Sequence, residues 1–217
     1  MGPRVRDDNM YKQAPPRVKR RKRLGAEVRE EGLAAARGLL LKGGPAAVTL
    51  ANIGDEIGMS HANVLHHFGS AASLQSALMG SMINDLTVAL DHVVEMLKTD
   101  AAAPRVIADR VFDAFDKGGA GPLAAWIILS GDIEHLEPVR EAVRSLVEAI
   151  VGQSKDDGAP ERVRLAVLMM AVTAFGDAVI GPHVRGMLDQ KDDAMRDLIA
   201  RILPLFLIPS GIPPAIS

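Results

Sequence analysis

The sequence predicts an all-α protein with about nine helices, and three observations support this prediction. From Leu24 onward, apolar residues recur at steps of three and four, which is the period of an amphipathic helix. Glycine and proline interrupt the pattern at intervals that suit helix ends, as at Gly43, Gly44 and Pro45. No segment shows sustained two-residue alternation, so we expect no sheet.

The composition excludes several classes of protein. At 217 residues the chain is long enough to bury a core without cross-links. It contains no cysteine, which excludes disulfides, Cys-ligated zinc, iron–sulfur clusters and a cysteine nucleophile. No amino-terminal apolar run follows a basic stretch, and the borderline apolar segment near 163–176 is interrupted by Arg164. We therefore expect a soluble, cytoplasmic protein that does not bind membranes.

The net charge of −2 conceals two unlike regions. Residues 1–42 hold 12 Lys or Arg against 5 Asp or Glu, which is +7, and residues 43–217 hold 13 against 22, which is −9. Residues 1–23 contain prolines and lack apolar periodicity, so we expect a flexible basic arm. Such an arm suits a polyanionic partner, although a solvated tail has the same composition. The cations at its centre are Arg17, Lys19, Arg20, Arg21, Lys22 and Arg23.

After the arm, the sequence predicts three helices over residues 24–72. The first spans about 24–42 and stops at the Gly-Gly-Pro triplet. Thr49 occupies an N-cap position before a short helix over 50–57, and Ser60 occupies another before a helix that ends at Gly69. Two short helices separated by Gly58, Met59 and Ser60 are typical of a helix-turn-helix, although ordinary helical hairpins share this spacing.

The remainder, residues 73–217, is predicted to be a larger helical domain. Glycine and proline clusters divide it into segments. The expected helices span about 72–98, 104–117, 121–130, 137–152, 160–185 and 191–208.

The stretch MSHANVLHHF, residues 59–68, concentrates His61, Asn63, His66 and His67. On one helix the three histidines point roughly 0°, 140° and 240° around the axis, which argues against a shared metal ion. No nucleophile or orienting group completes a catalytic set, so we expect neither an enzyme, a metal site nor a cofactor. Two interpretations remain: the histidines decorate a helix surface, or the first turn of the helix reads base edges in the major groove of DNA.

Residues 29–74, ending VTLANIGDEIGMSHANVLHHFGSAASL, resemble the DNA-binding domain of the TetR (tetracycline repressor) family of bacterial regulators. The family pattern combines a hydrophobic residue and Thr, a Gly-hydrophobic-Ser turn, a His-Phe pair and a Ser before the next helix. Matching or conservatively replaced positions are Thr49, Ile53, Gly58, Met59, Ser60, Val64, His67, Phe68, Ser70 and Leu74. The resemblance implies DNA contacts from the basic arm and from Thr49, Ser60, His61, Asn63, His66 and His67.

The sequence also departs from the family pattern. Gly54 and Ile57 replace two customary alanines, and Ala62 replaces a frequent glycine. Leu65 and Ala71 replace a Tyr and a Lys that commonly contact phosphate in the family. No Lys or Arg occurs from Gly43 through Leu97, so we expect the basic arm to supply the missing positive charge.

For residues 73–217 the resemblance implies an effector-binding and dimerisation domain. Bulky apolar residues on its middle helices are candidate pocket residues, although each also suits a plain core: Phe112, Phe115, Trp126, Met169, Met170 and Phe175. A small-residue stripe and a broad apolar face on the last two helices are candidates for the dimer interface, or equally for intramolecular packing. These residues are Val167, Ala171, Ala174, Ala178, Gly181, Leu198, Ile202 and Leu205.

Together these features predict a transcriptional regulator that binds a double-stranded DNA operator as a homodimer. The expected role is that of a repressor released by a small apolar effector. The alternative is a helical small-molecule-binding protein that keeps the fold without operator binding.

Overall fold

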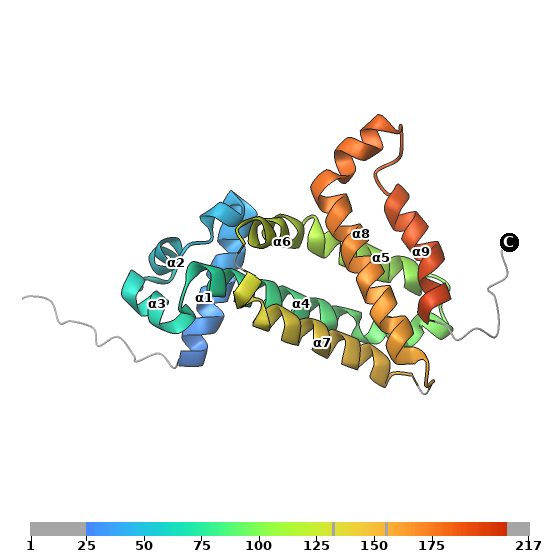
Figure 1. Ribbon diagram of the computed structural model, residues 1–217, viewed down its shortest axis with the longest axis horizontal. Coiled ribbons are helices and arrows are strands. Elements are labelled where there is room, and N and C mark those ends of the chain that lie inside the picture. Colours follow the sequence, from blue (N-terminus) through green and yellow to red (C-terminus); the bar gives the residue numbers. More distant parts are fainter. Residues whose placement is uncertain (1–24, 132, 155, 208–217) are drawn as a thin grey trace, which may run out of the picture.

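The computed structural model describes residues 25–131, 133–154 and 156–207, and these residues form helices and no strand. Figure 1 shows a small cluster of three helices at one end of the molecule and a larger helical body at the other. The α-helices are α1 (Gly25–Gly43), α2 (Leu50–Ile57), α3 (His61–Phe68), α4 (Ala71–Glu95), α5 (Ala103–Phe115), α6 (Ala120–Leu129), α7 (Glu137–Gly152), α8 (Ala159–Met187) and α9 (Ala194–Leu207). Short 3-10 turns are η1 (Pro45–Ala47), η2 (Met96–Lys98) and η3 (Ile133–His135).

The predicted all-α fold is confirmed, and so are the two predicted N-caps. The Thr49 hydroxyl accepts a hydrogen bond from the backbone N–H of Asn52 at 3.2 Å, and the Ser60 hydroxyl accepts one from that of Asn63 at 3.4 Å. Gly58 ends α2 in the left-handed conformation, with φ of 64°. These local signals fix the angle at which α3 leaves the turn.

The helices α1, α2 and α3 pack around a dense core. Ile53 and Val64 are fully buried and Phe68 is 5% exposed. A side chain at Gly32 would meet the Phe68 ring at 2.7 Å, so the glycine lets this ring lie against α1. At Gly54, a β-carbon would lie 2.6 Å from the Met59 carbonyl oxygen. The departure from alanine at this position is therefore explained by the close approach of α2 to the turn.

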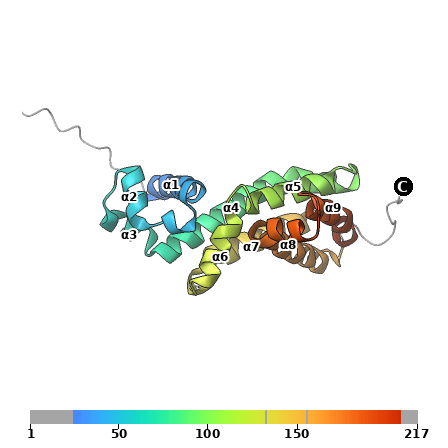
Figure 2. The same cartoon turned by 90° about the horizontal axis from the view of Figure 1, so that it is seen from above.

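Helix α4 connects the two parts of the molecule, as Figure 2 shows from above. Its first turns complete the amino-terminal core through Leu74 and Leu78, which are both buried. The buried amide of Gln75 donates to the Val48 carbonyl at 3.1 Å and so ties α4 to the segment before α2. Apolar residues of α6 join the same core, so α4 and α6 both link the helix-turn-helix to the larger body.

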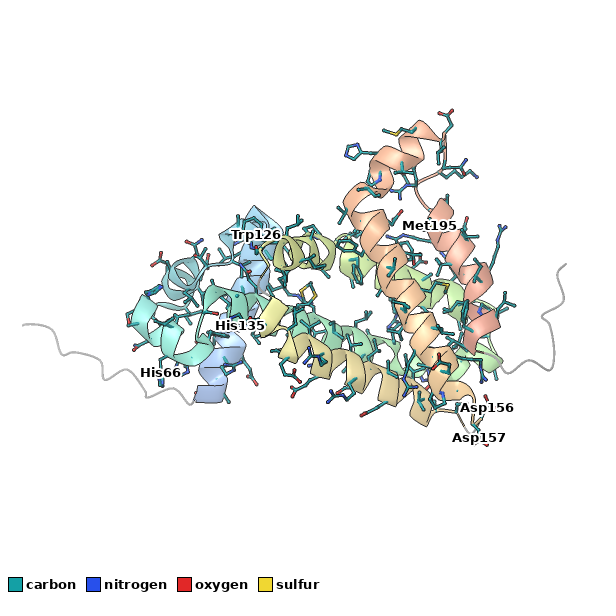
Figure 3. The ribbon with its side chains drawn as sticks, in the orientation of Figure 1. His66, Trp126, His135, Asp156, Asp157 and Met195 are labelled. Atoms are coloured by element: carbon teal, nitrogen blue, oxygen red, sulfur yellow. The ribbon has the colours of Figure 1, made fainter. Side chains whose placement is uncertain are left out.

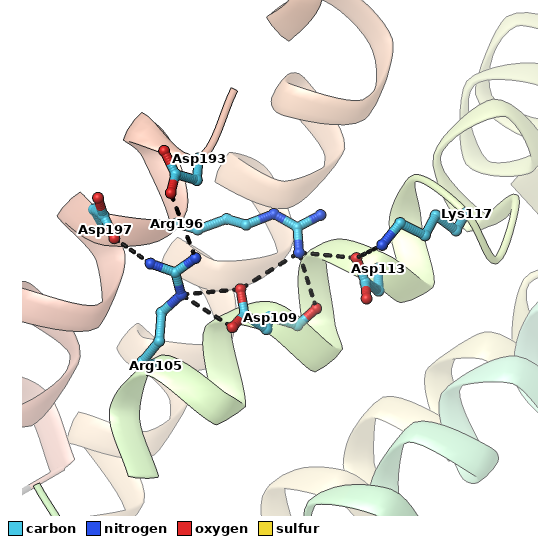
Figure 4. Close-up of polar contacts among 7 residues, drawn as sticks. All are labelled: Arg105, Asp109, Asp113, Lys117, Asp193, Arg196 and Asp197. Carbon is cyan, nitrogen blue, oxygen red and sulfur yellow. Dashed lines mark hydrogen bonds and ion pairs between the residues drawn. The ribbon is translucent and has the colours of Figure 1, made fainter. Parts of the chain in front are cut away.

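A second core lies among α4, α5, α8 and α9, where Phe112, Ile199 and Leu203 are almost fully buried. A chain of ion pairs joins α5 to the start of α9 (Figure 4). Within it Arg196 lies 2.8 Å from Asp113. Burial opposes ionisation of Asp113, but hydrogen bonds from Arg196 and Lys117 outweigh it and lower the pKa of this carboxyl. Its contribution to stability is therefore present above the ordinary carboxyl range and is lost as pH falls through the lowered pKa.

Candidate nucleic-acid interface and internal cavity

The surface of α3 carries most of the residues that the sequence predicts to contact DNA. Ser60, His61, Asn63 and His66 are exposed, whereas His67 is half-buried. Figure 3 shows His66 at the end of the molecule formed by the three small helices. Because Val64 and Phe68 bury the opposite side of the helix, the polar face is held toward solvent by a packed core. Thr49 is half-buried at the start of α2.

Little fixed positive charge accompanies this face. Residues 25–97 contain only Arg29, Arg37 and Lys42 as Lys or Arg, and all three lie on α1. The Arg29 guanidinium donates to the His67 carbonyl at 2.5 Å and lies 5.1 Å from the centre of the Phe68 ring. Arg37 lies 2.5 Å from Asp85 of α4. Two of the three cations are thus engaged in joining helices, and Asp55 and Glu56 add exposed negative charge on α2.

The histidines do not gather as metal ligands do. The rings of His66 and His67 have centroids 5.5 Å apart and meet edge-on at 67°. Across the part of the chain that the structure describes, no group of three or more His, Asp, Glu or Cys side chains is placed to hold an ion. The six arm cations, Arg17 and Lys19 to Arg23, lie outside the described residues.

An apolar cavity of 320 Å³ occupies the larger body. Its wall is built by α4, α5, α6, α7, α8 and α9, and it contains no charged or polar side chain. The residues in its wall include Met82, Leu86, Leu90, Val111, Phe115, Val139, Val143, Val167, Met170 and Leu203. Such a chamber can hold a hydrocarbon-like molecule, and it falls at the lower end of the range for small-molecule sites.

Of the six predicted pocket residues, Phe115 and Met170 lie in the cavity wall. Phe112 is instead packed in the second core at 1% exposure, and Trp126 is 41% exposed on α6. Met169 and Phe175 are half-buried on α8, and neither lines the cavity. Sequence reasoning missed the contributions of α4 and α7, whose aliphatic residues at helical spacing were the available signal.

The predicted small-residue stripe of α8 faces the protein's own body. Val167 and Ala171 line the cavity, and Ala174 and Gly181 are buried. Ala178 packs against α6, where a side chain at Gly121 would meet its β-carbon at 2.7 Å. Small residues allow close helix packing, and here they allow it within one chain.

The opposite side of α8 is apolar and exposed. Its large exposed residues are Leu165, Leu168, Val172, Val179, Ile180, Val184 and Met187. On α9, the predicted interface residues Leu198 and Leu205 are 49% and 65% exposed, and Ile202 is half-buried. Among helices of the described chain, α8 is long and apolar enough to span a membrane by length and composition, a test that helices of soluble proteins also pass. Large exposed apolar patches on proteins often mark interaction sites.

Comparisons with known proteins agree with this architecture. Residues 33–78 match the family described as bacterial regulatory proteins, tetR family. A solved structure of a candidate TetR-family transcriptional regulator from Mesorhizobium loti MAFF303099 is similar, with 15% sequence identity and a TM-score of 0.52. This similarity covers 86% of the present chain and 98% of the other, so both chains share the fold over most of their length. A search of curated proteins found no match.

The family match coincides with the described helix-turn-helix, from α1 into the first turns of α4. It confirms the resemblance that the residues around α3 predict, and the structural similarity confirms the predicted helical body. Residues 33–78 thus match the tetR family of bacterial regulatory proteins, and the chain as a whole has an all-helical fold similar to that of the solved regulator.

Proposed function

We propose that the protein is a cytoplasmic transcriptional repressor that binds a double-stranded DNA operator as a homodimer and is released by a small apolar effector. The observation that carries this proposal is the exposed polar face of α3, which a capped and packed helix-turn-helix presents at one end of the molecule. A helix presented in this way fits the major groove.

The proposed contacts follow from the position of each side chain. His61 and Asn63 lie in the first turn of α3, where an amide can pair with adenine and an imidazole can bond a base edge or a phosphate. The amino-terminal ends of α2 and α3, at Thr49 and Ser60, suit phosphate because their backbone N–H groups point outward. His66 and His67 are further phosphate candidates, and the basic arm supplies the fixed charge.

The cavity supports the effector part of the proposal. Because its wall is apolar, an uncharged hydrocarbon part of a molecule would enter it at little desolvation cost. Helices α4 and α6 line it and also contribute to the amino-terminal core, so an occupant that displaces either helix would also move α3. Release of DNA by such an occupant would be a shift between two conformations.

The exposed apolar side of α8, together with α9, supports the homodimer. Two copies joined through this face would bury it. The dimer would then present two α3 helices to the two half-sites of an operator. The same pairing explains the apolar character of α8 without a membrane. The buried side of α8 also carries an ion pair, between Asp177 and Arg185, that is mostly shielded from solvent.

A gel-shift titration with DNA flanking the gene of this protein tests the proposal. We expect a discrete shifted complex, weakened about tenfold or more by Asn63→Ala, since one bidentate base contact contributes roughly 1–3 kcal/mol. His135→Ala is the matched control, because His135 is an exposed residue of η3 outside the helix-turn-helix (Figure 3). Equal weakening by both substitutions, or no complex with any flanking fragment, would contradict operator reading by α3.

A second candidate function is small-molecule binding without operator recognition. The absence of Lys and Arg from Gly43 through Leu97 favours it, because phosphate neutralisation normally provides much of the affinity for DNA. A protein that holds a small molecule tightly but gives no DNA complex at low salt would support this second function.

A further inference from the structure

The position of α3 is fixed separately at its two ends. Its first turn follows directly on the turn from α2, and Val64 is fully buried in the core that these two helices share. Its last turn, by contrast, is held by α1, through contacts that involve the Phe68 ring and the His67 carbonyl. The contacts of the last turn therefore decide how far α3 can tilt about its first turn.

Arg29, near the start of α1, makes two contacts with this last turn. Its guanidinium donates to the His67 carbonyl at 2.5 Å and lies 5.1 Å from the centre of the Phe68 ring, within the range of a cation–π interaction. Gly32, one turn further along α1, leaves room for the same ring, which a β-carbon at this position would meet at 2.7 Å. The Phe68 ring therefore meets α1 at two successive turns.

The His67 carbonyl lies where a helix needs a donor from outside. The last four carbonyls of an α-helix have no backbone partner within the helix. In α3, the Leu65 carbonyl is satisfied by the backbone N–H of Gly69 at 2.7 Å. At His67 the donor is a guanidinium, whose charge complements the partial negative charge at the end of a helix. Because Arg29 is exposed, we expect this contact to hold α3 in place while adding little to global stability.

Reading of an operator depends on the tilt of α3. A helix of eight residues is about 12 Å long, so a tilt of about 10° displaces one end relative to the other by about 2 Å. Hydrogen bonds tolerate only a fraction of this displacement, since their donor–acceptor distances span about 2.7–3.2 Å. With a loose last turn, Asn63 near the start of α3 and His66 near its end could therefore not keep their proposed contacts together.

We infer that Arg29 is a positioning residue for DNA binding, which acts through α3 and not by contact with phosphate. Its guanidinium is already engaged by the His67 carbonyl and the Phe68 ring, and these contacts fasten the last turn of α3 to α1. The inference rests on the proposed operator binding. It adds to that proposal a residue outside the exposed face of α3.

Two substitutions at Arg29 test the inference by fluorescence anisotropy with a flanking DNA fragment. Arg29→Met removes the charge and the donor but keeps a long side chain beside Phe68. We expect it to weaken binding about tenfold, because α3 then has the binding orientation in only a fraction of the molecules. Arg29→Lys restores a charged donor and should recover most of the affinity. Unchanged affinity in Arg29→Met would overturn the inference.

Arg37→Met is the matched control. Arg37 belongs to the same helix, but its guanidinium pairs with Asp85 of α4 at 2.5 Å. The control removes the same charge from α1, and we expect its affinity for DNA to stay within about twofold of that of the original chain, as for most surface substitutions. An equal loss in Arg29→Met and Arg37→Met would assign the effect to the charge of α1 and contradict positioning by Arg29.

The salt dependence of binding separates positioning from direct contact with DNA. Loss of one phosphate contact flattens the log–log salt slope by about 1, whereas loss of a positioning residue leaves the slope unchanged. We therefore expect Arg29→Met to bind more weakly with the slope of the original chain. A slope that is flatter by about 1 per protomer would place Arg29 on the phosphate backbone and overturn the inference.

Hydrogen exchange of the free chain tests the fastening of α3 without DNA. Amides of residues 65–69 should exchange several-fold faster in Arg29→Met, while those of α8 and the urea midpoint stay close to the values of the original chain. Unchanged exchange at residues 65–69 would contradict the fastening. A large fall in the urea midpoint would make Arg29 a residue of general stability and would also count against the inference.

These measurements distinguish failure of the inference from failure of the proposed function. Normal DNA binding by the original chain and by Arg29→Met would overturn the inference alone. Absence of DNA binding by the original chain would contradict the proposed function and, with it, the role assigned to Arg29.

Discussion

The two ends of the molecule differ in how they use apolar residues. Around α3, the large residues Ile53, Val64 and Phe68 are buried, and Gly32 and Gly54 allow close approach of the Phe68 ring and of the Met59 backbone. Around α8, a cavity lies on one side of the helix and Leu168 and Val172, each 60% exposed, lie on the other. The core of the helix-turn-helix is therefore closed by residues of α1 to α3 together with α4 and α6, whereas the larger body has apolar surface that a ligand and a second copy would complete.

Apolar periodicity therefore predicts different environments for the side chains of the two regions. In the helix-turn-helix, most large apolar positions at helical spacing are buried in one core. In a body of six helices the same spacing is compatible with core, cavity wall or interface. Substitutions in each region can test this distinction.

The largest expected effect is from Phe68→Ala in the closed core. Removing a ring that is 5% exposed and packed on Gly32 should lower the free energy of unfolding by about 3–5 kcal/mol. Phe115→Ala should cost clearly less, because part of that side chain already faces the cavity. Urea unfolding followed by circular dichroism compares the two variants. Equal losses would show that the cavity wall is packed as tightly as the core.

A smaller effect is expected from charges on the exposed face of α8. The double substitution Leu168→Glu with Val172→Glu should raise the dimer dissociation constant about a hundredfold, since two carboxylates would be desolvated at the interface. Light scattering coupled to gel filtration measures the mass. Val88→Glu is the control, because Val88 is 79% exposed on α4, away from this face. A dimer that survives the double substitution would place the interface elsewhere.

The smallest expected effect is from His66, whose side chain is exposed on α3. If its ring contacts a phosphate, the loss of that single contact in His66→Gln should lower DNA affinity a few-fold. Fluorescence anisotropy with the operator compares the variant with the original chain. Unchanged affinity would remove His66 from the phosphate contacts.

Local signals made the fold predictable from the sequence. The hydroxyls of Thr49 and Ser60 each accept a hydrogen bond from the backbone N–H three residues later in the chain. Such caps depend only on a short stretch of sequence, so they can be predicted from it. The small-residue stripe shows the limit of this reasoning: the spacing of Ala174 and Gly181 suits either an interface or internal packing, and only the structure shows that both residues are buried within one chain. The hydrogen bond between Gln153 and Asp91 was not predictable either, because these residues are brought together only by the packing of α7 on α4.

The central claim is that an α3 face with no fixed positive charge binds DNA with charge supplied by the arm. The salt dependence of operator affinity, measured by anisotropy for the full chain and for a chain lacking residues 1–23, tests it most directly. We predict that the deletion removes most of the affinity and flattens the log–log salt slope by up to about 5 per protomer, as six lost phosphate contacts require. Unchanged affinity and an unchanged slope would contradict the claim.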